Sequence, residues 1–368
     1  MIMALLLALP HFLVAQETIV STIMHDGQER DYRLRIPPGA EAEARPLVFN
    51  LHGFGSNAFQ QEAYSQMNPV ADTAGFYVCY PNGINDAWNV GWAFGSTADD
   101  VGFISALIDS LSAIYNIDPS RVYSCGMSNG GFMSYRLACE LNGRIAAVAS
   151  VTGSMVPGYI GGCNPGRAVP VLEIHGTEDP TVPYEGQPLL AVSIEDLLAF
   201  WVDNNGCNEP PVIEELPDTD MTDGSTVTEI RYADCPNGME VLHYRINGGA
   251  HTWPSALIEL GVTNQDLHGS EAIWHFFNRY TLAGSVSVKG VAAPALRPFP
   301  NPTAGKVFLD LPVRPGQVSV FNAAGLRLQQ FSNGGGAVML DLSAYPAGIY
   351  WIRVAQGRQS WAAKVVRR

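Results

Sequence analysis

The sequence predicts an α/β fold followed by a small all-β sandwich, and three observations lead to this prediction. Short apolar runs alternate with helical stretches between residues 47 and 280, which is typical of a mostly parallel sheet flanked by helices. Beyond residue 298, short strands are separated by glycine turns without a helical pattern, which indicates a sandwich. The charge changes as well, because residues 1–283 carry 33 acidic and 11 basic side chains and residues 284–368 carry 2 and 10.

The chain opens with an apolar run that ends at Val14-Ala15-Gln16. It is too short for a stable membrane anchor, so we interpret residues 1–15 as a secretory signal peptide cleaved after Ala15; a buried first strand is the alternative. No other stretch of the sequence is long and apolar enough to predict a transmembrane helix.

Residues 16–283 are expected to form the α/β domain. A hairpin through Asp26-Gly27 comes first, because this dipeptide favours a tight two-residue turn. Period-2 and period-3.6 patterns then predict the elements in order. The expected strands are 18–24, 31–36, 47–51, 76–80, 122–125, 146–151, 169–174 and 239–245, and the expected helices end at 74 or cover 99–115, 131–139 and 271–280.

Residues 284–297 form the predicted linker, because they are small, aliphatic and proline-containing. Residues 298–368 then form the predicted sandwich. Its expected strands are 307–311, 317–322, 337–342 and 349–354.

Composition excludes several classes of function. The formal net charge of -14 disfavours a nucleic-acid partner, which needs a basic surface. The acidic run from Asp218 to Gly224 lacks the register of a calcium-binding EF-hand loop. No nucleotide, metal or flavin motif is present, so the sequence predicts neither a metal nor a cofactor.

Export would make the six cysteines candidates for disulfides. Cys207 and Cys235 flank a polar, acidic excursion, and Cys139 and Cys163 form the next plausible pair. The other two cysteines, at positions 79 and 125, lie in predicted core strands and are interpreted as small buried hydrophobes. The spacing leaves the connectivity open.

The pentapeptide from Gly126 to Gly130 is the strongest indication of chemistry. A strand-like stretch precedes it and a helix-like stretch follows it, so Ser128 is predicted to sit on a sharp strand-to-helix turn. Such a turn exposes the serine hydroxyl to a base and requires small flanking residues. Ser128 is therefore the candidate nucleophile.

An activated serine needs an orienting acid and a histidine base, which follow such a turn in that order. Asp179 comes just after the strand predicted at 169–174, at the sheet edge where ligands bind. Glu178 is its competitor. His251 lies in a glycine-rich loop after a strand and is the candidate base, whereas His52 and His175 each end a strand before a glycine and are interpreted as loop-shaping residues.

The backbone N–H groups of Phe54 and Asn129 are the candidate oxyanion donors, because one lies in the loop after the strand at 47–51 and the other begins the helix after the serine. Loop aromatics could form an apolar or planar acyl pocket. The candidates for substrate contacts are Trp92, Trp253 and Tyr184; for Trp92 and Trp88, packing of the loop is an equal alternative.

Six motifs in order resemble the polyhydroxybutyrate depolymerase/feruloyl esterase family of secreted α/β-hydrolases. The resemblance covers roughly residues 17–283 and implies an α/β-hydrolase fold, the triad Ser128, Asp179 and His251, and disulfides, which favours Cys207 with Cys235. The motifs are Leu51-His52-Gly53-Phe54-Gly55, Tyr80-Pro81-Asn82-Gly83, Asp99-Asp100-Val101-Gly102-Phe103, Gly126-Met127-Ser128-Asn129-Gly130-Gly131, His175-Gly176-Thr177-Glu178-Asp179 and Gly249-Ala250-His251-Thr252-Trp253-Pro254.

The tail from Pro298-Phe299-Pro300-Asn301-Pro302 to Lys364-Val365-Val366 resembles the C-terminal sorting domain of the type IX secretion system. This resemblance implies export to the cell surface or medium, with the secretion machinery as a partner. Extracellular polyester depolymerases of the family usually carry a polymer-binding module at this place, so the departure favours other esters.

Together these inferences predict a secreted serine carboxylesterase that acts on feruloyl or acetyl esters of plant polysaccharide. The first alternative is a polyester or polyester-oligomer depolymerase. A serine peptidase is a second alternative, because prolyl peptidases share the fold and the triad order, although no gating domain is evident. A non-catalytic binding protein would lack a triad member, and none is missing.

Overall fold

The computed structural model describes residues 17–208, 210–285, 298–311, 316–322, 327–333, 336–356 and 359–368. These residues form two compact units, one before and one after residues 286–297. The signal peptide predicted at residues 1–15 and most of the predicted linker therefore lie outside the described residues.

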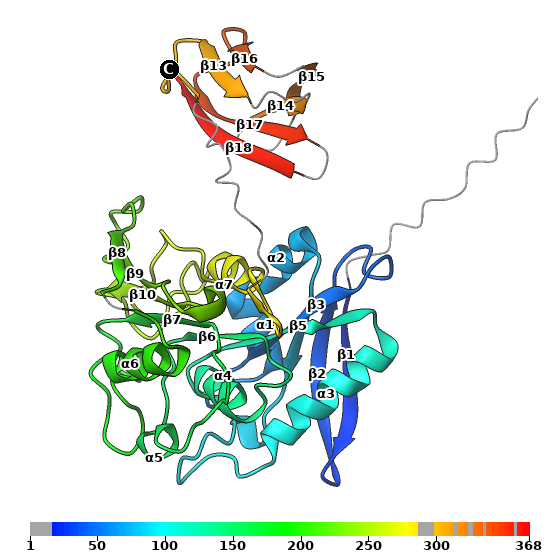
Figure 1. Ribbon diagram of the computed structural model, residues 1–368, viewed down its shortest axis with the longest axis vertical. Coiled ribbons are helices and arrows are strands. Elements are labelled where there is room, and N and C mark those ends of the chain that lie inside the picture. Colours follow the sequence, from blue (N-terminus) through cyan, green and yellow to red (C-terminus); the bar gives the residue numbers. More distant parts are fainter. Residues whose placement is uncertain are drawn as a thin grey trace, which may run out of the picture. The chain divides into compact units, whose positions relative to one another are not determined.

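The first unit is built on ten strands that pair into one sheet (Figure 1). Their bounds are β1 (Glu17–His25), β2 (Gln28–Ile36), β3 (Arg45–Leu51), β4 (Tyr77–Pro81), β5 (Ile117–Met127), β6 (Ala147–Val151), β7 (Val171–Gly176), β8 (Val212–Glu215), β9 (Thr226–Tyr232) and β10 (Val241–Asn247). Two further two-residue strands, β11 (Tyr280–Thr281) and β12 (Gly284–Ser285), pair with each other after the last helix.

The strand order is β1-β2-β4-β3-β5-β6-β7-β10-β9-β8. From β4 to β10 every neighbouring pair in this order is parallel, and the flanking strands on both sides are antiparallel. The carboxyl ends of the parallel strands consequently meet along one side of the sheet, here called the carboxyl edge, and their first residues lie along the amino edge. Ligands of such sheets bind outside the carboxyl ends of the strands.

Seven helices flank this sheet on its two faces. Residues of α3, α4 and α6 belong to one apolar cluster and residues of α1, α2 and α7 to another, so each set covers one face. The bounds are α1 (Ala58–Ser65), α2 (Met67–Ala74), α3 (Asp100–Ile114), α4 (Asn129–Glu140), α5 (Pro157–Ile160), α6 (Ile194–Asn205) and α7 (Gly269–Phe277), with 3₁₀ turns at Ile84–Asp86 and Pro236–Gly238.

Local sequence explains where several of these helices begin. The side chain of Asp99 accepts a hydrogen bond from the Gly102 N–H at 2.9 Å, which caps α3. Ser193 caps α6 in the same way through the Asp196 N–H at 3.0 Å. Each cap satisfies an N–H group that has no partner inside the helix.

Disulfides join two pairs of cysteines in this unit. Cys139, at the end of α4, is bonded to Cys163, and Cys207, just after α6, is bonded to Cys235. Cys79 and Cys125 are free and buried in β4 and β5. Burial raises the pKa of both thiols well above the ordinary value.

The second unit contains two antiparallel sheets around one apolar core, which confirms the predicted sandwich. The order of one sheet is β15-β14-β17-β18, and β13 pairs with β16 in the other. Buried residues of both sheets form the core, including Val307 and Leu340 from one and Ile352 from the other. The strands are β13 (Lys306–Leu311), β14 (Gly316–Asn322), β15 (Arg327–Asn333), β16 (Gly336–Asp341), β17 (Gly348–Gln356) and β18 (Gln359–Arg367).

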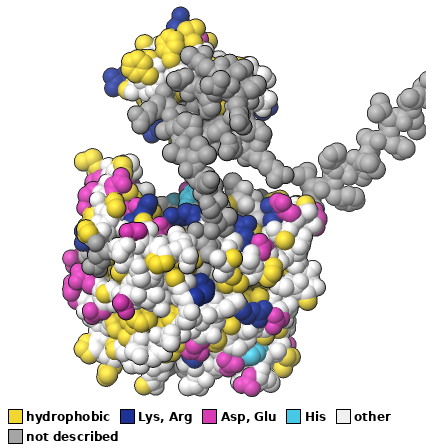
Figure 2. All heavy atoms as spheres, viewed as in Figure 1, with side chains coloured by type: hydrophobic (Ala, Val, Ile, Leu, Met, Phe, Trp, Pro, Cys, Tyr) yellow, Lys and Arg dark blue, Asp and Glu magenta, His cyan; other side chains and the backbone are white. Residues whose placement is uncertain are grey.

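The fold class predicted from the sequence is confirmed, with differences in detail. The helical stretch expected up to Ala74 is two helices, because Gln66 adopts a left-handed backbone conformation with φ of 53° between α1 and α2. Several elements were not predicted from the sequence, among them α5, α6, β8, β9, β15 and β18. Figure 2 shows acidic side chains at the edge formed by β8, where Glu214 and Glu215 are exposed.

Candidate active site

Ser128 lies between β5 and α4, in a backbone conformation that ordinary residues rarely adopt. Its φ and ψ are 54° and −122°. A Cβ at Gly126 would lie 2.6 Å from the Gly130 carbonyl oxygen, and one at Gly130 would lie 2.1 Å from the Leu51 carbonyl oxygen. Steric contact with the neighbouring strand therefore requires glycine on both sides of this serine.

His251 and Asp179 lie together at the carboxyl edge, although 72 residues separate them. His251 Nδ1 is 2.7 Å from Asp179 Oδ2. Asp179 follows β7 and His251 follows β10, and these two strands are parallel neighbours. The competitor Glu178 is exposed to solvent, so the acid that contacts His251 is Asp179.

The other carboxylate oxygen of Asp179 is held by its own loop. Oδ1 accepts hydrogen bonds from the N–H groups of Thr181 and Val182 at 2.8 and 2.9 Å. Burial would raise the pKa of Asp179, but the hydrogen bond and charge of His251, the nearby His175 and the Val182 N–H together lower it below its ordinary value. Asp179 is thus an ionised acceptor with its orientation fixed.

A buried polar cluster lies behind this acid. His175 Nε2 is 2.8 Å from the Val182 carbonyl oxygen and 3.5 Å from Asp179 Oδ2. Its Nδ1 is 2.9 Å from Glu173, which also accepts a hydrogen bond from the Tyr135 hydroxyl at 2.7 Å. Burial raises the pKa of Glu173. These contacts anchor the loop that carries Asp179 to β7 and α4.

Ser128 and His251 line the same cavity, of about 680 Å³. Apart from these two residues its walls are mainly apolar, and the described structure records no hydrogen bond between the two side chains. In serine hydrolases this contact is often long before substrate binds. The other lining residues are Gly53, Phe54, Ser56, Phe59, Gln60, Gln61, Ala63, Tyr64, Met127, Thr181, Ile258 and Leu260.

Ser128 also borders a smaller cavity of about 180 Å³, with an aromatic wall. Trp92 stacks on Phe94 with ring centroids 5.2 Å apart and lies 5.0 Å from Phe132. Phe54 and Thr181 line both cavities, so a substrate group bound at Ser128 can extend into either one. The sequence analysis named Trp92 but not Phe94 or Phe132.

The other two aromatic candidates do not line either cavity. Trp253 is only 1% exposed, and its backbone N–H contacts the hydroxyl of Tyr64, so it packs behind the wall. The Tyr184 hydroxyl is turned into the protein, 3.0 Å from His243 Nε2. Burial raises the pKa of Tyr184 to about 12. The hydrogen bond to a buried histidine explains why this tyrosine faces inward.

The candidate oxyanion donors Phe54 and Asn129 lie on either side of Ser128. A Cβ at Gly53 would be 3.4 Å from the Ser128 Cβ, so the Gly53–Phe54 peptide closely approaches the serine. Asn129 is the first residue of α4, whose N–H has no intrahelical acceptor. A helix N-terminus also favours negative charge. Both positions therefore suit an oxyanion hole.

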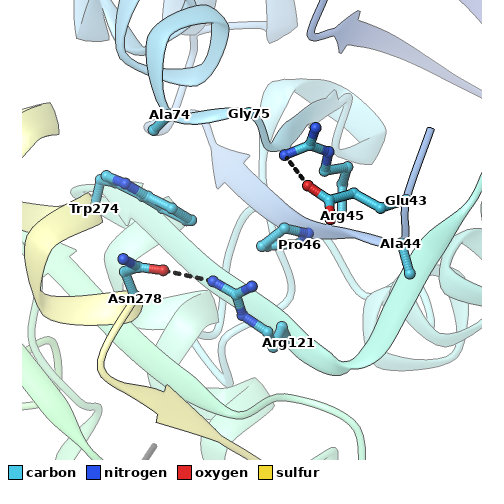
Figure 3. Close-up of a pocket in the computed structure, with 9 residues that line it drawn as sticks. All are labelled: Glu43, Ala44, Arg45, Pro46, Ala74, Gly75, Arg121, Trp274 and Asn278. Atoms are coloured by element: carbon cyan, nitrogen blue, oxygen red, sulfur yellow. Dashed lines mark hydrogen bonds and ion pairs between the residues drawn. The ribbon is translucent and has the colours of Figure 1, made fainter. Parts of the chain in front are cut away.

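A separate pocket of about 380 Å³ lies at the amino edge and is unsuited to acyl transfer (Figure 3). Arg45 begins β3 and pairs with Glu43 at 3.1 Å, while Arg121 donates to Asn278 at 2.5 Å. Its lining residues include no serine, cysteine or histidine. Such a pocket can hold polar groups, but its one carboxylate, Glu43, is paired with Arg45 and has no serine or histidine beside it in the lining.

The described residues contain no cluster of three or more metal-ligating side chains. Within the same residues, no helix has the length and apolar character needed to cross a membrane.

Comparison with known proteins adds family information. The family model described as Esterase PHB depolymerase matches residues 30–163, and the model described as Secretion system C-terminal sorting domain matches residues 297–368. NocK of Nocardia uniformis subsp. tsuyamanensis, a protein named as an esterase, is 31% identical over 71% of this chain and 81% of NocK. The resemblances inferred from the motifs are thereby confirmed.

Two further relatives carry more specific names. Feruloyl esterase B of Piromyces equi is 31% identical over 59% of this chain, which spans only 42% of that protein. A solved acetyl xylan esterase from Aspergillus awamori superposes with a TM-score of 0.51 at 15% identity, covering 71% of this chain and 99% of the esterase. The latter likeness supports the fold alone.

Proposed function

We propose that this chain, which belongs to the carboxylesterase family of these relatives, cleaves hydroxycinnamoyl or related esters of plant polysaccharide. Ser128, His251 and Asp179 would carry out the reaction. The observation that carries the proposal is the position of Ser128, which borders both an aromatic cavity and the cavity that contains His251.

The hydrogen-bond pattern assigns each group its role. Ionised Asp179 accepts at Oδ2, so His251 Nδ1 carries the proton and its Nε2 is free to act as the base. Nε2 takes the Ser128 hydroxyl proton as Oγ attacks the ester carbonyl carbon, and the oxyanion binds the N–H groups of Phe54 and Asn129. His251 then returns the proton to the leaving alcohol. Water hydrolyses the acyl-enzyme by the same steps.

The aromatic cavity supports a planar acyl group. Its lining carries no charged side chain, and the rings of Trp92, Phe94 and Phe132 can contact both a phenyl ring and a conjugated double bond. The indole N–H of Trp92 donates to the Leu190 carbonyl oxygen at 2.9 Å, which holds this wall in place. An acetyl group would leave most of the cavity unfilled.

A polyester oligomer is the second candidate substrate, and the larger cavity favours it. Phe59, Ile258 and Leu260 line that cavity and are more than half exposed, which provides an apolar rim for an aliphatic chain.

The test is an assay of the full chain and Ser128→Ala on methyl ferulate, p-nitrophenyl acetate and a 3-hydroxybutyrate oligomer. We expect the highest kcat/KM on methyl ferulate and loss of all three activities in the variant. Turnover of the oligomer without turnover of ferulate would replace the acyl proposal by the polyester one. Activity that survives in Ser128→Ala would contradict the proposed nucleophile.

Export follows from the C-terminal sorting domain, which directs the chain to the cell surface or medium. We propose in addition that residues 1–15 are a signal peptide that brings the chain to this pathway. Sequencing the N-terminus of the secreted protein tests the proposal, since cleavage after Ala15 predicts Gln16 as the first residue.

A further inference from the structure

The loop that carries the Phe54 N–H is held by a buried histidine whose proton can be placed. The Gly83 N–H lies 3.0 Å from His52 Nε2. Because a backbone N–H can only donate, Nε2 must be the acceptor in this contact. Nδ1 therefore carries the proton and donates to the Gly53 carbonyl oxygen at 2.8 Å. Burial lowers the pKa of His52, which keeps the ring neutral and this pattern intact.

This hydrogen bond, together with one from the Ser56 N–H to the same carbonyl oxygen at 3.2 Å, fixes the direction of a proposed oxyanion donor. The Gly53 carbonyl and the Phe54 N–H belong to one planar trans peptide, in which C=O and N–H point in opposite directions. Since the carbonyl points to His52, the N–H must point away from it. A Cβ on Gly53 would lie 3.4 Å from the Ser128 Cβ, so this peptide is next to the candidate nucleophile.

His52 is connected to the other proposed donor through Trp88. The indole N–H of Trp88 donates to the His52 carbonyl oxygen at 2.9 Å. The side chain of Asn129 makes two hydrogen bonds with the Trp88 backbone. It accepts one from the Trp88 N–H at 2.6 Å and donates one to the Trp88 carbonyl oxygen at 3.2 Å. Asn129, Trp88 and His52 are all at most 1% exposed.

We propose that His52 and Trp88 are positioning residues that join the two halves of the oxyanion hole into one unit. The side chain of Asn129 holds Trp88, and Trp88 holds the His52 backbone. The His52 ring, alongside the Ser56 N–H, holds the Gly53 carbonyl oxygen and so helps to orient the Gly53–Phe54 peptide. The loop after β3 and the start of α4 thus move together. This inference rests on the proposed function, because it concerns the same oxyanion hole.

If His52 and Trp88 position the oxyanion donors, their substitution should have a specific effect on the kinetics. A looser Phe54 N–H weakens binding of the oxyanion, which exists only in the transition state, and leaves binding of the ground-state ester unchanged. Loss of one oxyanion donor costs about 10²–10³ in kcat. Loosening a donor without removing it should cost less, about tenfold, with KM almost unchanged.

The experiment compares Trp88→Phe with Trp201→Phe in the full chain. Trp201 is equally buried, but its indole N–H has no hydrogen-bond partner among the described residues, so its variant loses packing without losing a hydrogen bond found there. Kinetics on p-nitrophenyl acetate are normalised to the active sites titrated with a fluorophosphonate. We expect Trp88→Phe to lower kcat about tenfold and to weaken inhibition by a trifluoromethyl ketone, a tetrahedral-intermediate mimic, in the same proportion.

A second pair of variants addresses the histidine ring. His52→Asn keeps a side-chain N–H within reach of the Gly53 carbonyl, and His52→Leu has none. We expect kcat of His52→Asn to exceed that of His52→Leu by about tenfold. The double variant His52→Leu/Trp88→Phe should lose little more than His52→Leu alone, since coupled residues are not additive.

The inference is wrong if Trp88→Phe and Trp201→Phe have equal kcat, or if the loss appears in KM. Equal kcat in both His52 variants would also overturn it. These outcomes are distinguishable from failure of the proposed function, because the wild type would still turn over esters and Ser128→Ala would not.

Discussion

The two edges of the central sheet carry pockets with opposite chemistry. At the carboxyl edge, cavities of about 680 and 180 Å³ border Ser128 and have mainly apolar walls. At the amino edge, a pocket of about 380 Å³ contains Arg45, Arg121 and Glu43 (Figure 3). The difference lies in what the chain delivers to each edge.

Strand direction explains this difference. Loops after parallel strands all leave at the carboxyl edge, so β3, β5, β7 and β10 bring the proposed oxyanion donors, nucleophile, acid and base to one place. The amino edge receives strand beginnings, where Arg45 pairs with Glu43 and Arg121 donates to the Asn278 side chain. The direction of the strands therefore accounts for the different chemistry at the two edges of this sheet.

The largest expected effect is that of Ser128→Ala. Removal of the nucleophile should lower kcat by about 10⁴- to 10⁶-fold on every ester, with little change in the thermal midpoint, since the side chain makes no hydrogen bond in the described structure. Stopped assays with purified protein measure the rate, and circular dichroism checks the fold. Retained turnover would show that the reaction takes place at another site, and the contrast between the two edges of the sheet would no longer hold.

Trp92→Ala tests the aromatic cavity. We expect kcat/KM for methyl ferulate to fall about 10- to 100-fold, which corresponds to about 1–3 kcal/mol of lost contact in the transition state. Activity on p-nitrophenyl acetate should change less than threefold, because an acetyl group does not fill this cavity. Equal losses on both esters would indicate a general structural defect and would contradict the assignment of the cavity to the acyl group.

Acid sensitivity should arise in part from His243, which is buried in β10. Burial lowers the pKa of His243 to about 3, whereas the unfolded chain titrates near about 6.5. Between these values the unfolded state binds a proton that the folded state does not, so stability falls as pH drops, by about 1.4 kcal/mol per pH unit.

Urea unfolding of the wild type and His243→Gln between about pH 6.5 and 4 measures this slope. The variant should show a flatter pH dependence than the wild type. His175, Arg245 and the Tyr184 hydroxyl also lie near His243. These groups remain in the His243→Gln variant, so the difference between the two slopes reports on His243 itself. Identical slopes would show that another group governs acid unfolding.

The smallest expected effect is that of Arg45→Ala at the amino edge. Glu43, its ion-pair partner, is mostly exposed, so we expect a loss of stability of less than about 1 kcal/mol. Kinetic constants on methyl ferulate should stay within about twofold. A tenfold change in kcat would show that the two edges communicate and would require a different account of the pocket in Figure 3.

Local features made part of this site predictable. The glycines around Ser128 can be read from the sequence, because the turn itself excludes a Cβ. The positions of Asp179 and His251 followed from the strands that precede them. The capping pair Ser193 and Gly206 around α6 also offered a signal that the sequence analysis did not use.

The cavity walls could not be predicted in the same way. Phe94 comes from a loop and Phe132 from α4, and only the tertiary fold brings them beside Trp92. Tyr184 is a loop aromatic of the kind that often lines pockets. Its hydroxyl points inward instead, because it contacts His243, which lies in a strand 59 residues later. Such choices depend on partners that are distant in the chain.

The cysteines define a sequence of oxidative maturation. Disulfides form in extracytoplasmic compartments, and the C-terminal sorting domain indicates export. We therefore expect the Cys139–Cys163 and Cys207–Cys235 links to form during or after export. Mispairing is restrained by chemistry, because the buried thiols of Cys79 and Cys125 stay protonated and therefore exchange poorly once the core has formed. We expect α4, which begins next to the proposed nucleophile Ser128, to be linked at its far end through Cys139 only in the exported protein.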